Sequence, residues 1–276
     1  MKVVLFCGGL GLRMDDSSAR VPKPMVPIGT RPILWHIMKY YAHFGHKDFI
    51  VCLGHRGEVI KEFFLSYNEA LSNDFVFANG GTEIQLIRSD IHDWRITFVD
   101  TGMHASVGER LAAVRPYLAG EEVFLATYGD GVTDAPLPEV IDTVVSRDVV
   151  AGFLSVRPST YSFHTVDADE DGIVREIQNI AASNVRVNAG FFVFRPTIFD
   201  VIQRGEDLVD GPFRRLIERE QLLAVGYDGF WAPMDTLKDK ALLDTLLERG
   251  EAPWLVWEPE GDGEQHPEAT TVAEGA

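Results

Sequence analysis

The stretch KVVLFCGGLGLRM, residues 2–14, joins an apolar run to a glycine-rich turn that leads to an arginine. The run at 2–7 predicts a buried strand, because it is short, apolar and followed by turn residues. Gly8, Gly9 and Gly11 leave the backbone bare, so a phosphate or a base could approach its N–H groups closely. A tight turn between a strand and a helix explains the same glycines equally well. The pattern lacks the third glycine of a dinucleotide fingerprint and the Gly-Lys-Ser/Thr of a Walker A loop.

Outward from this stretch, short apolar runs alternate with segments of helical periodicity. The predicted strands lie at 48–54, 95–100, 122–130 and 149–156, and the predicted helices at 31–45, 57–64, 108–118 and 136–147. Thr30 is the predicted N-cap of the first helix, and Gly45 its end. This order predicts an α/β fold with three layers, in which helices cover both faces of a mostly parallel, Rossmann-like mixed sheet.

The pattern changes after residue 160. A hairpin turning at Asp171 and Gly172 is predicted there, then a strand at 188–196 and helices at 212–220 and 237–249. No repeat or linker interrupts this order, which indicates a single domain over residues 1–257. Residues 258–276 hold six acids and no Lys or Arg, and we expect this tail to be disordered.

Composition narrows the class of protein. The net charge of −17 argues against nucleic-acid binding, and no apolar run is long enough for a membrane span. Cys7 and Cys52 lie in apolar runs, where we expect buried thiols rather than a disulfide or a metal pair. These features predict a reduced, cytoplasmic protein.

Three further residues suggest chemistry on phosphates. Pro22 and Pro24 stiffen the chain around Lys23, which favours a lysine that must point at an anion. Asp130 follows a predicted strand and could hold Mg²⁺ there, or serve only in an Asp-Gly turn. Asp235 precedes a predicted helix and could share that metal, or simply cap the helix.

Several blocks together resemble the sugar-1-phosphate nucleotidyltransferases, and most closely their cytidylyltransferase branch. They are GGLGLRM (8–14), PKPMVPIGTRPILWHIMKYY (22–41), FVDTG (98–102), TYGDGV (127–132), NAGFFVF (188–194) and GFWAPMDTLKDK (229–240). The resemblance implies a reaction in which an NTP, with CTP expected, and a sugar 1-phosphate, with glucose 1-phosphate expected, give a nucleotide-sugar and pyrophosphate. It also implies Mg²⁺ as cofactor and a homo-oligomer, for which the long segment 66–94 is a candidate contact.

The resemblance assigns site residues by matching position. Arg13, Lys23, Asp130 and Asp235 would be catalytic, and the two aspartates would hold the metal. The nucleotide would be bound by Phe6, Cys7, Gly8, Gly9, Leu10, Gly11, Leu12, Arg13, Lys23, Arg110 and Gly129. The sugar phosphate would be bound by Gly129, Arg186, Asn188 and Gly190.

This sequence departs from the family pattern mainly on the acceptor side. Leu12 replaces a threonine of the first loop, and His164 replaces a glycine after an aromatic residue. Asn179 and Ile180 stand where the family has a Glu-Lys pair that reaches the sugar phosphate, so Arg186 is the nearest cationic substitute.

These losses leave other functions open. The acceptor could be a modified sugar or a cyclitol phosphate, with a different NTP, or the chain could be an inactive nucleotide-sugar-binding protein. A dinucleotide-dependent oxidoreductase is disfavoured, because its glycine fingerprint is absent.

Overall fold

The computed structural model describes residues 1–9, 21–158 and 164–257. Leu10, Gly11, Leu12, Arg13 and the predicted acidic tail lie outside the described residues, and their roles stay predictions. Within the described residues, no helix combines the length and the apolar character that crossing a membrane requires.

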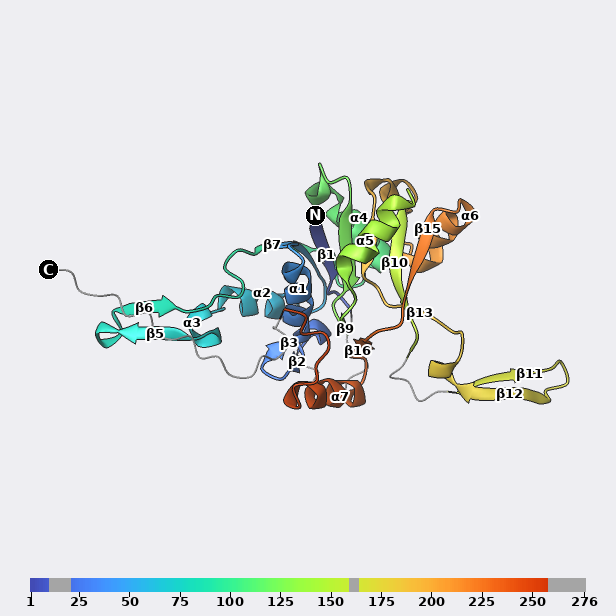
Figure 1. Ribbon diagram of the computed structural model, residues 1–276. Helices are drawn as coiled ribbons and strands as arrows, with labels where there is room; N and C mark the ends of the chain where they lie inside the picture. Colours follow the sequence, from blue (N-terminus) through green and yellow to red (C-terminus); the bar gives the residue numbers. More distant parts are fainter. Residues whose placement is uncertain (10–20, 159–163, 258–276) are drawn as a thin grey trace.

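An eight-stranded mixed sheet forms the centre of the molecule (Figure 1). Its strands are β1 (Lys2–Phe6), β4 (Asp48–Leu53), β7 (Arg95–Asp100), β8 (Phe124–Tyr128), β10 (Ala151–Val156), β13 (Val187–Asn188), β14 (Phe192–Phe194) and β15 (Leu222–Tyr227). β8, β1, β4 and β7 run parallel in that spatial order, and β14 joins β8 antiparallel. β10 pairs with β15 in parallel, and with β14 and β13 antiparallel.

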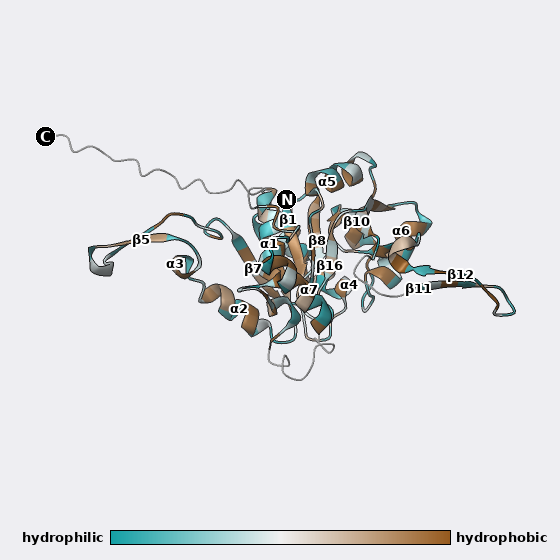
Figure 2. Cartoon of the chain, turned by 60° about the horizontal axis from the view of Figure 1, so that its bottom comes forward, coloured by the Kyte–Doolittle hydropathy of each residue, from teal (hydrophilic) through white to brown (hydrophobic). Residues whose placement is uncertain are grey.

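Helices cover both faces of this sheet, as predicted. The α-helices are α1 (Ile33–His43), α2 (Gly57–Leu65), α3 (Glu69–Ser72), α4 (Val107–Val114), α5 (Leu137–Ser146), α6 (Arg214–Glu218) and α7 (Leu237–Glu248). Side chains alternate along β1, so that Val3 and Leu5 pack with α1 and α5, while Val4 packs with α4 and α6. The central strands are accordingly coloured as hydrophobic in Figure 2. The predicted fold class is confirmed.

One helix start differs from the prediction. Pro32, and not Thr30, is the N-cap of α1, and it makes no side-chain capping bond. The reason is a short antiparallel ribbon in which β3 (Arg31–Pro32) pairs with β2 (Pro27–Ile28), so the chain stays extended until Ile33. The predicted end is confirmed, since Gly45 has φ +84° and its N–H donates to the carbonyl of Ala42 at 3.0 Å.

Two hairpins project from the body on opposite sides (Figure 1). The first pairs β5 (Phe75–Ala78) with β6 (Glu83–Leu86), and the sequence pattern did not reveal it. The second pairs β11 (His164–Ala168) with β12 (Val174–Asn179) and confirms the predicted hairpin, whose turn includes Gly172 at φ +83°.

Both cysteines are buried free thiols, as expected. Cys7 directly follows β1, and its N–H donates to the carbonyl of Cys52 in β4 at 3.1 Å. Burial raises the pKa of the Cys52 thiol to about 12, so this group stays protonated at neutral pH.

Candidate active site

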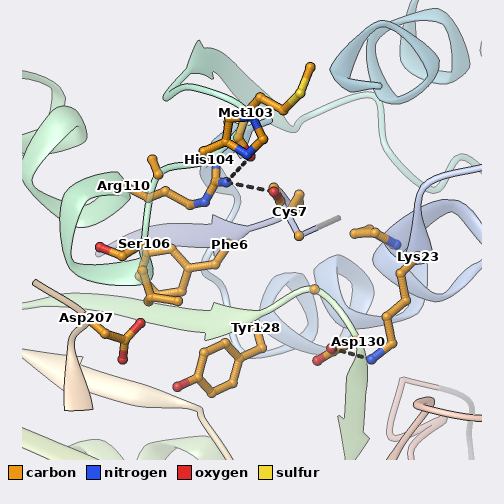
Figure 3. A pocket seen from close by; sticks show the side chains of 16 residues that line it. Phe6, Cys7, Lys23, Met103, His104, Ser106, Arg110, Tyr128, Asp130 and Asp207 are labelled. Carbon is orange, nitrogen blue, oxygen red and sulfur yellow. Dashed lines mark hydrogen bonds and ion pairs between the residues drawn. The ribbon is translucent and has the colours of Figure 1, made fainter. Parts of the chain in front are cut away.

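A cavity of about 400 Å³ opens at the carboxyl ends of β1 and β8 (Figure 3). Five separate segments line it: 6–9, 23–24, 103–107 with Arg110, 128–130, and Asp207. Ligands of open parallel sheets bind at this end of the strands, because the loops that follow the strands meet there. The fold thus gathers the predicted nucleotide-binding residues Phe6, Cys7, Gly8, Gly9, Lys23, Arg110 and Gly129 in one place.

A small ribbon next to the sheet brings Asp130 and Asp235 together. β9 (Gly131–Thr133) pairs antiparallel with β16 (Trp231–Pro233), with Gly131 opposite Pro233. The N–H of Met234 donates to the carbonyl of Asp130 at 2.8 Å. Two aspartates that are distant in the sequence therefore emerge side by side.

Both carboxylates bind the ammonium of Lys23. Lys23 Nζ donates to Asp130 Oδ2 at 2.7 Å, and it also donates to Asp235 Oδ1. Burial favours the neutral amine, but the two carboxylates outweigh it and raise the Lys23 pKa above its ordinary value. The three predicted catalytic residues within the described chain thus form one cluster.

Asp235 is not the helix cap that its position in the sequence also allowed. Thr236 caps α7, accepting from the N–H of Asp239 at 3.2 Å, and Asp239 Oδ2 accepts from the N–H of Thr236 at 2.8 Å. This capping box leaves the carboxylate of Asp235 to face Lys23.

Prolines hold Lys23 in place, as the sequence indicated. Lys23 begins a 3₁₀ turn, Lys23–Met25, in which the N–H of Met25 donates to the carbonyl of Pro22 at 2.8 Å. Pro24 is buried and lies against Gly129, where an added Cβ would come within 3.1 Å of the proline ring. The backbone at Lys23 is therefore held rigidly, while the ammonium at the end of its side chain reaches the cavity.

Arg110 lies in the wall of the cavity, where it supports the backbone of the glycine turn. Its guanidinium donates to the carbonyls of Gly8 at 2.6 Å and Leu53 at 3.1 Å, and to Thr101 Oγ1 at 2.7 Å. Burial lowers its pKa. A Cβ on Gly8 would lie 2.0 Å from Arg110 Nη1, so the arginine occupies the space of the missing side chain. At Gly9, no atom of the described residues lies within 4 Å of that position, so they leave its backbone open.

Of the residues predicted to bind the sugar phosphate, Gly129 lines the cavity, whereas Asn188 and Gly190 lie behind the lining residue Tyr128. Asn188 Oδ1 accepts from the N–H of Gly190 at 2.9 Å, and a Cβ on Gly190 would lie 3.0 Å from the ring of Tyr128, which lines the cavity. Arg186 lies outside the lining, because it donates to the carbonyls of Ser155 and Tyr227 and pairs with Asp228. Its predicted role gains no support from this placement.

Sequence reasoning missed part of the lining. Met103, His104 and Ser106 follow β7, in a loop of which only the start belongs to a quoted block. Tyr128 sits within TYGDGV but was not singled out, and Asp207 belongs to no motif. Asp207 becomes visible only through the folded loop that carries it.

Comparison with known proteins agrees with this geometry. Residues 2–245 match the model of the family described as nucleotidyl transferase. The chain is 40% identical to the glucose-1-phosphate cytidylyltransferase of Salmonella typhi over 94% of its own length and 100% of that protein's. Among solved structures, UDP-glucose pyrophosphorylase in complex with UDP-glucose aligns with a TM-score of 0.65 at 15% identity, covering 90% of this chain and 98% of that one.

A second solved structure, HddC from Yersinia pseudotuberculosis, aligns with a TM-score of 0.63 at 18% identity over 89% of this chain and 99% of that one. At such identities these two structures show the fold alone. The family match spans most of the chain, and the Salmonella relative is matched over its full length. This chain belongs to the nucleotidyl transferase family.

Proposed function

We propose that the protein joins the CMP unit of CTP to glucose 1-phosphate, giving CDP-glucose and pyrophosphate. The curated relative of 40% identity, a glucose-1-phosphate cytidylyltransferase, supports this choice of substrates. The observation that carries the proposal is that Lys23 and Asp130 line the cavity at the carboxyl ends of β1 and β8, with Asp235 also bound to the Lys23 ammonium.

The reaction needs no nucleophile from the protein. A phosphate oxygen of glucose 1-phosphate attacks the α-phosphorus of CTP, the bond from that phosphorus to the bridging oxygen breaks, and pyrophosphate leaves with the electron pair. A phosphate monoester carries its second charge at neutral pH, so no base has to activate it. What the chain must supply is alignment of the two substrates and neutralisation of their charge.

The two aspartates fit Mg²⁺. Their carboxylates already converge on one cation, the Lys23 ammonium, and carboxylate oxygens are the ligands that Mg²⁺ prefers. No cluster of three or more His, Cys, Asp or Glu in the described residues could form a complete protein cage. This suits a metal held by two carboxylates together with substrate phosphates and water. Mg²⁺ bound there would neutralise negative charge between the two phosphate groups.

Residues of the cavity wall would bind and align the nucleotide. When CTP is bound, the Lys23 ammonium donates to its phosphates, a role that Arg13 is predicted to share. The open backbone at Gly9 allows close approach of the nucleotide, and Arg110 keeps Gly8 in position. These contacts place negative charge next to fixed donors in a partly dehydrated site.

The experiment is magnesium-dependent pyrophosphate release with glucose 1-phosphate and, in turn, CTP, UTP, ATP, GTP and dTTP. We expect release with CTP, its loss in Asp130→Asn and after chelation of the metal, and full activity in Asp142→Asn. Asp142 makes a matched control, since it is exposed on α5 away from the cavity. Release with another nucleotide alone would contradict the choice of CTP. CTP binding without turnover would contradict glucose 1-phosphate as the acceptor.

A further inference from the structure

We propose that Asp207 selects the acceptor, by accepting a hydrogen bond from a hydroxyl group of the sugar. This inference rests on the proposed function and adds a residue that determines its specificity. The carboxylate of Asp207 lies outside the cluster of Lys23, Asp130 and Asp235, and Asp207 belongs to none of the blocks that resemble the family.

Asp207 lines the same cavity as Lys23 and Asp130, but on the other side of Tyr128 (Figure 3). With phosphates held beside Lys23, the part of a ligand that reaches Asp207 must be free of phosphate, because two anions in a partly dehydrated cavity repel each other. An ionised carboxylate only accepts hydrogen bonds. The group that meets Asp207 must therefore donate one, as a sugar hydroxyl does.

The loop that carries Asp207 is firmly anchored. Ser106 Oγ donates to the carbonyl of Glu206 at 2.6 Å, and the carboxylate of Glu206 accepts from both terminal nitrogens of Arg215. The loop also touches the start of α4, since a Cβ on Gly108 would lie 2.4 Å from the carbonyl oxygen of Glu206. Such anchoring fixes the direction of the next side chain, which a specificity residue requires.

One oxygen of Asp207 remains available. Its Oδ1 accepts from the N–H of Val209 at 3.1 Å, and among the described residues no other hydrogen bond to this carboxylate exists. Asp207 is half-buried, so a hydroxyl group of the ligand would replace a water molecule at this oxygen with little loss of entropy.

The packing of Tyr128 leads us to assign this end of the cavity to the acceptor. Tyr128, beside Asp207, packs against Gly190 of the block that the family resemblance assigns to the sugar phosphate. The family's lysine is replaced by Ile180, and Arg186 is committed to Asp228. Arg186 therefore does not replace the lysine's contact to the acceptor phosphate, and Asp207 offers a contact of another kind, to a sugar hydroxyl.

The test compares the binding of CDP and CDP-glucose by calorimetry in the wild type and in Asp207→Asn. Asparagine keeps an oxygen for the N–H of Val209 but turns the free acceptor into a donor. We expect the affinity for CDP-glucose to fall about 10- to 100-fold, as on losing a hydrogen bond to a charged group, with the affinity for CDP unchanged. Asp210→Asn, the same change at an exposed position in the helical turn that follows the loop, should alter neither affinity.

A second measurement identifies the hydroxyl group. The KM values of the 2-, 3-, 4- and 6-deoxy analogues of glucose 1-phosphate are compared in both enzymes, and one analogue should be penalised in the wild type but not in Asp207→Asn. Equal penalties in both enzymes, or equal loss of CDP and CDP-glucose binding in the variant, would overturn the role of Asp207. A wild type that binds neither ligand would instead overturn the proposed function, and this inference with it.

Discussion

Lys23 balances the negative charge of Asp130 and Asp235 in the candidate site. Two carboxylates at close range repel each other, and the ammonium between them removes that repulsion in the ligand-free protein. The phosphates of a bound nucleotide compete for the same ammonium. One side chain therefore stabilises the empty site and, in the proposed reaction, binds the substrate.

The variant Lys23→Met tests this double role. We expect kcat/KM for CTP to fall by about 10²- to 10³-fold, as on removing a donor to a charged transition state. The free energy of unfolding should fall by only about 1 kcal/mol, because both aspartates stay partly exposed to water. Pyrophosphate release and urea unfolding measure the two effects. Lys240→Met, which breaks a lysine–aspartate pair outside the cavity, should leave kcat/KM unchanged, and an active Lys23→Met enzyme would refute the role.

His36 makes stability depend on pH. The ring lies buried between the carbonyl of Ile28, 3.3 Å from Nε2, and the indole N–H of Trp254, 3.4 Å from Nδ1. Since Trp254 donates, Nδ1 must accept, and the neutral ring is required. Burial lowers the His36 pKa to about 4 from an ordinary value of 6.5.

Between these two values the unfolded chain binds a proton that the folded chain does not, so stability is lost as the pH falls. The free energy of unfolding should decrease by about 3 kcal/mol from pH 6.5 to pH 4, and the slope that His36 contributes should decline to zero as the pH rises above 6.5. Urea unfolding at several pH values measures the slope. His46, whose pKa burial also lowers, adds its own slope, so the difference between the wild type and His36→Gln isolates His36. If the free energy of unfolding changed with pH in the same way in both proteins, His36 would not be the source of the pH dependence.

At the scale of elements, local pattern predicted most of the sheet and its helices, because buried strands and amphipathic helices carry their own periodicity. The hairpin of β5 and β6 was not predicted, because β5 is apolar at every position and exposes Phe75, Val76 and Phe77, so this strand shows no alternation with polar residues. The sequence also left Asp235 open as either a metal ligand or the cap of α7. That choice depends on the pairing of β9 with β16, which joins distant parts of the chain.

The contact between α4 and the Asp207 loop yields a prediction at this scale. In Gly108→Ala the new methyl group would lie 2.4 Å from the carbonyl oxygen of Glu206, and the loop must move. We expect the free energy of unfolding to fall by about 1–3 kcal/mol, as for overpacking in a core. CDP-glucose binding should weaken as well, because Asp207 moves with the loop. Gly9→Ala, where no atom of the described part of the chain lies within 4 Å of the new methyl group, should keep the stability of the wild type in the same urea titration.

For the whole molecule, the rule that parallel strands present ligands at their carboxyl ends was enough to group Gly8 and Asp130 from the sequence. The same rule gives no information about residues on irregular loops. The engagement of Arg186 by Asp228 and the position of Asp207 depend on side-chain partners from unrelated segments. The acceptor side was therefore the part of the site that the sequence could describe least.

The hairpin of β5 and β6 bears on assembly. It extends away from the body (Figure 1), and its apolar side chains are exposed, with Phe77 at 65% and Ile84 at 53%. An isolated two-stranded hairpin is marginally stable in water, and an exposed apolar patch of this kind commonly marks a protein interface. We propose that a second copy of the chain covers it, in line with the homo-oligomer that the family resemblance implies.

This assembly should be visible by light scattering as a mass above the 30.7 kDa of the chain. Phe77→Asp places a charge in the proposed interface, where it would be buried without a partner, and should shift the mass towards that of the monomer. The matched control is Ile217→Asp, which charges an apolar residue of α6 that is 62% exposed on the body and should leave the mass unchanged. A monomeric wild type would refute the homo-oligomer. A Phe77→Asp protein that keeps the wild-type mass would locate the interface away from this hairpin, and the exposed apolar residues of β11 and β12 would be the next to charge.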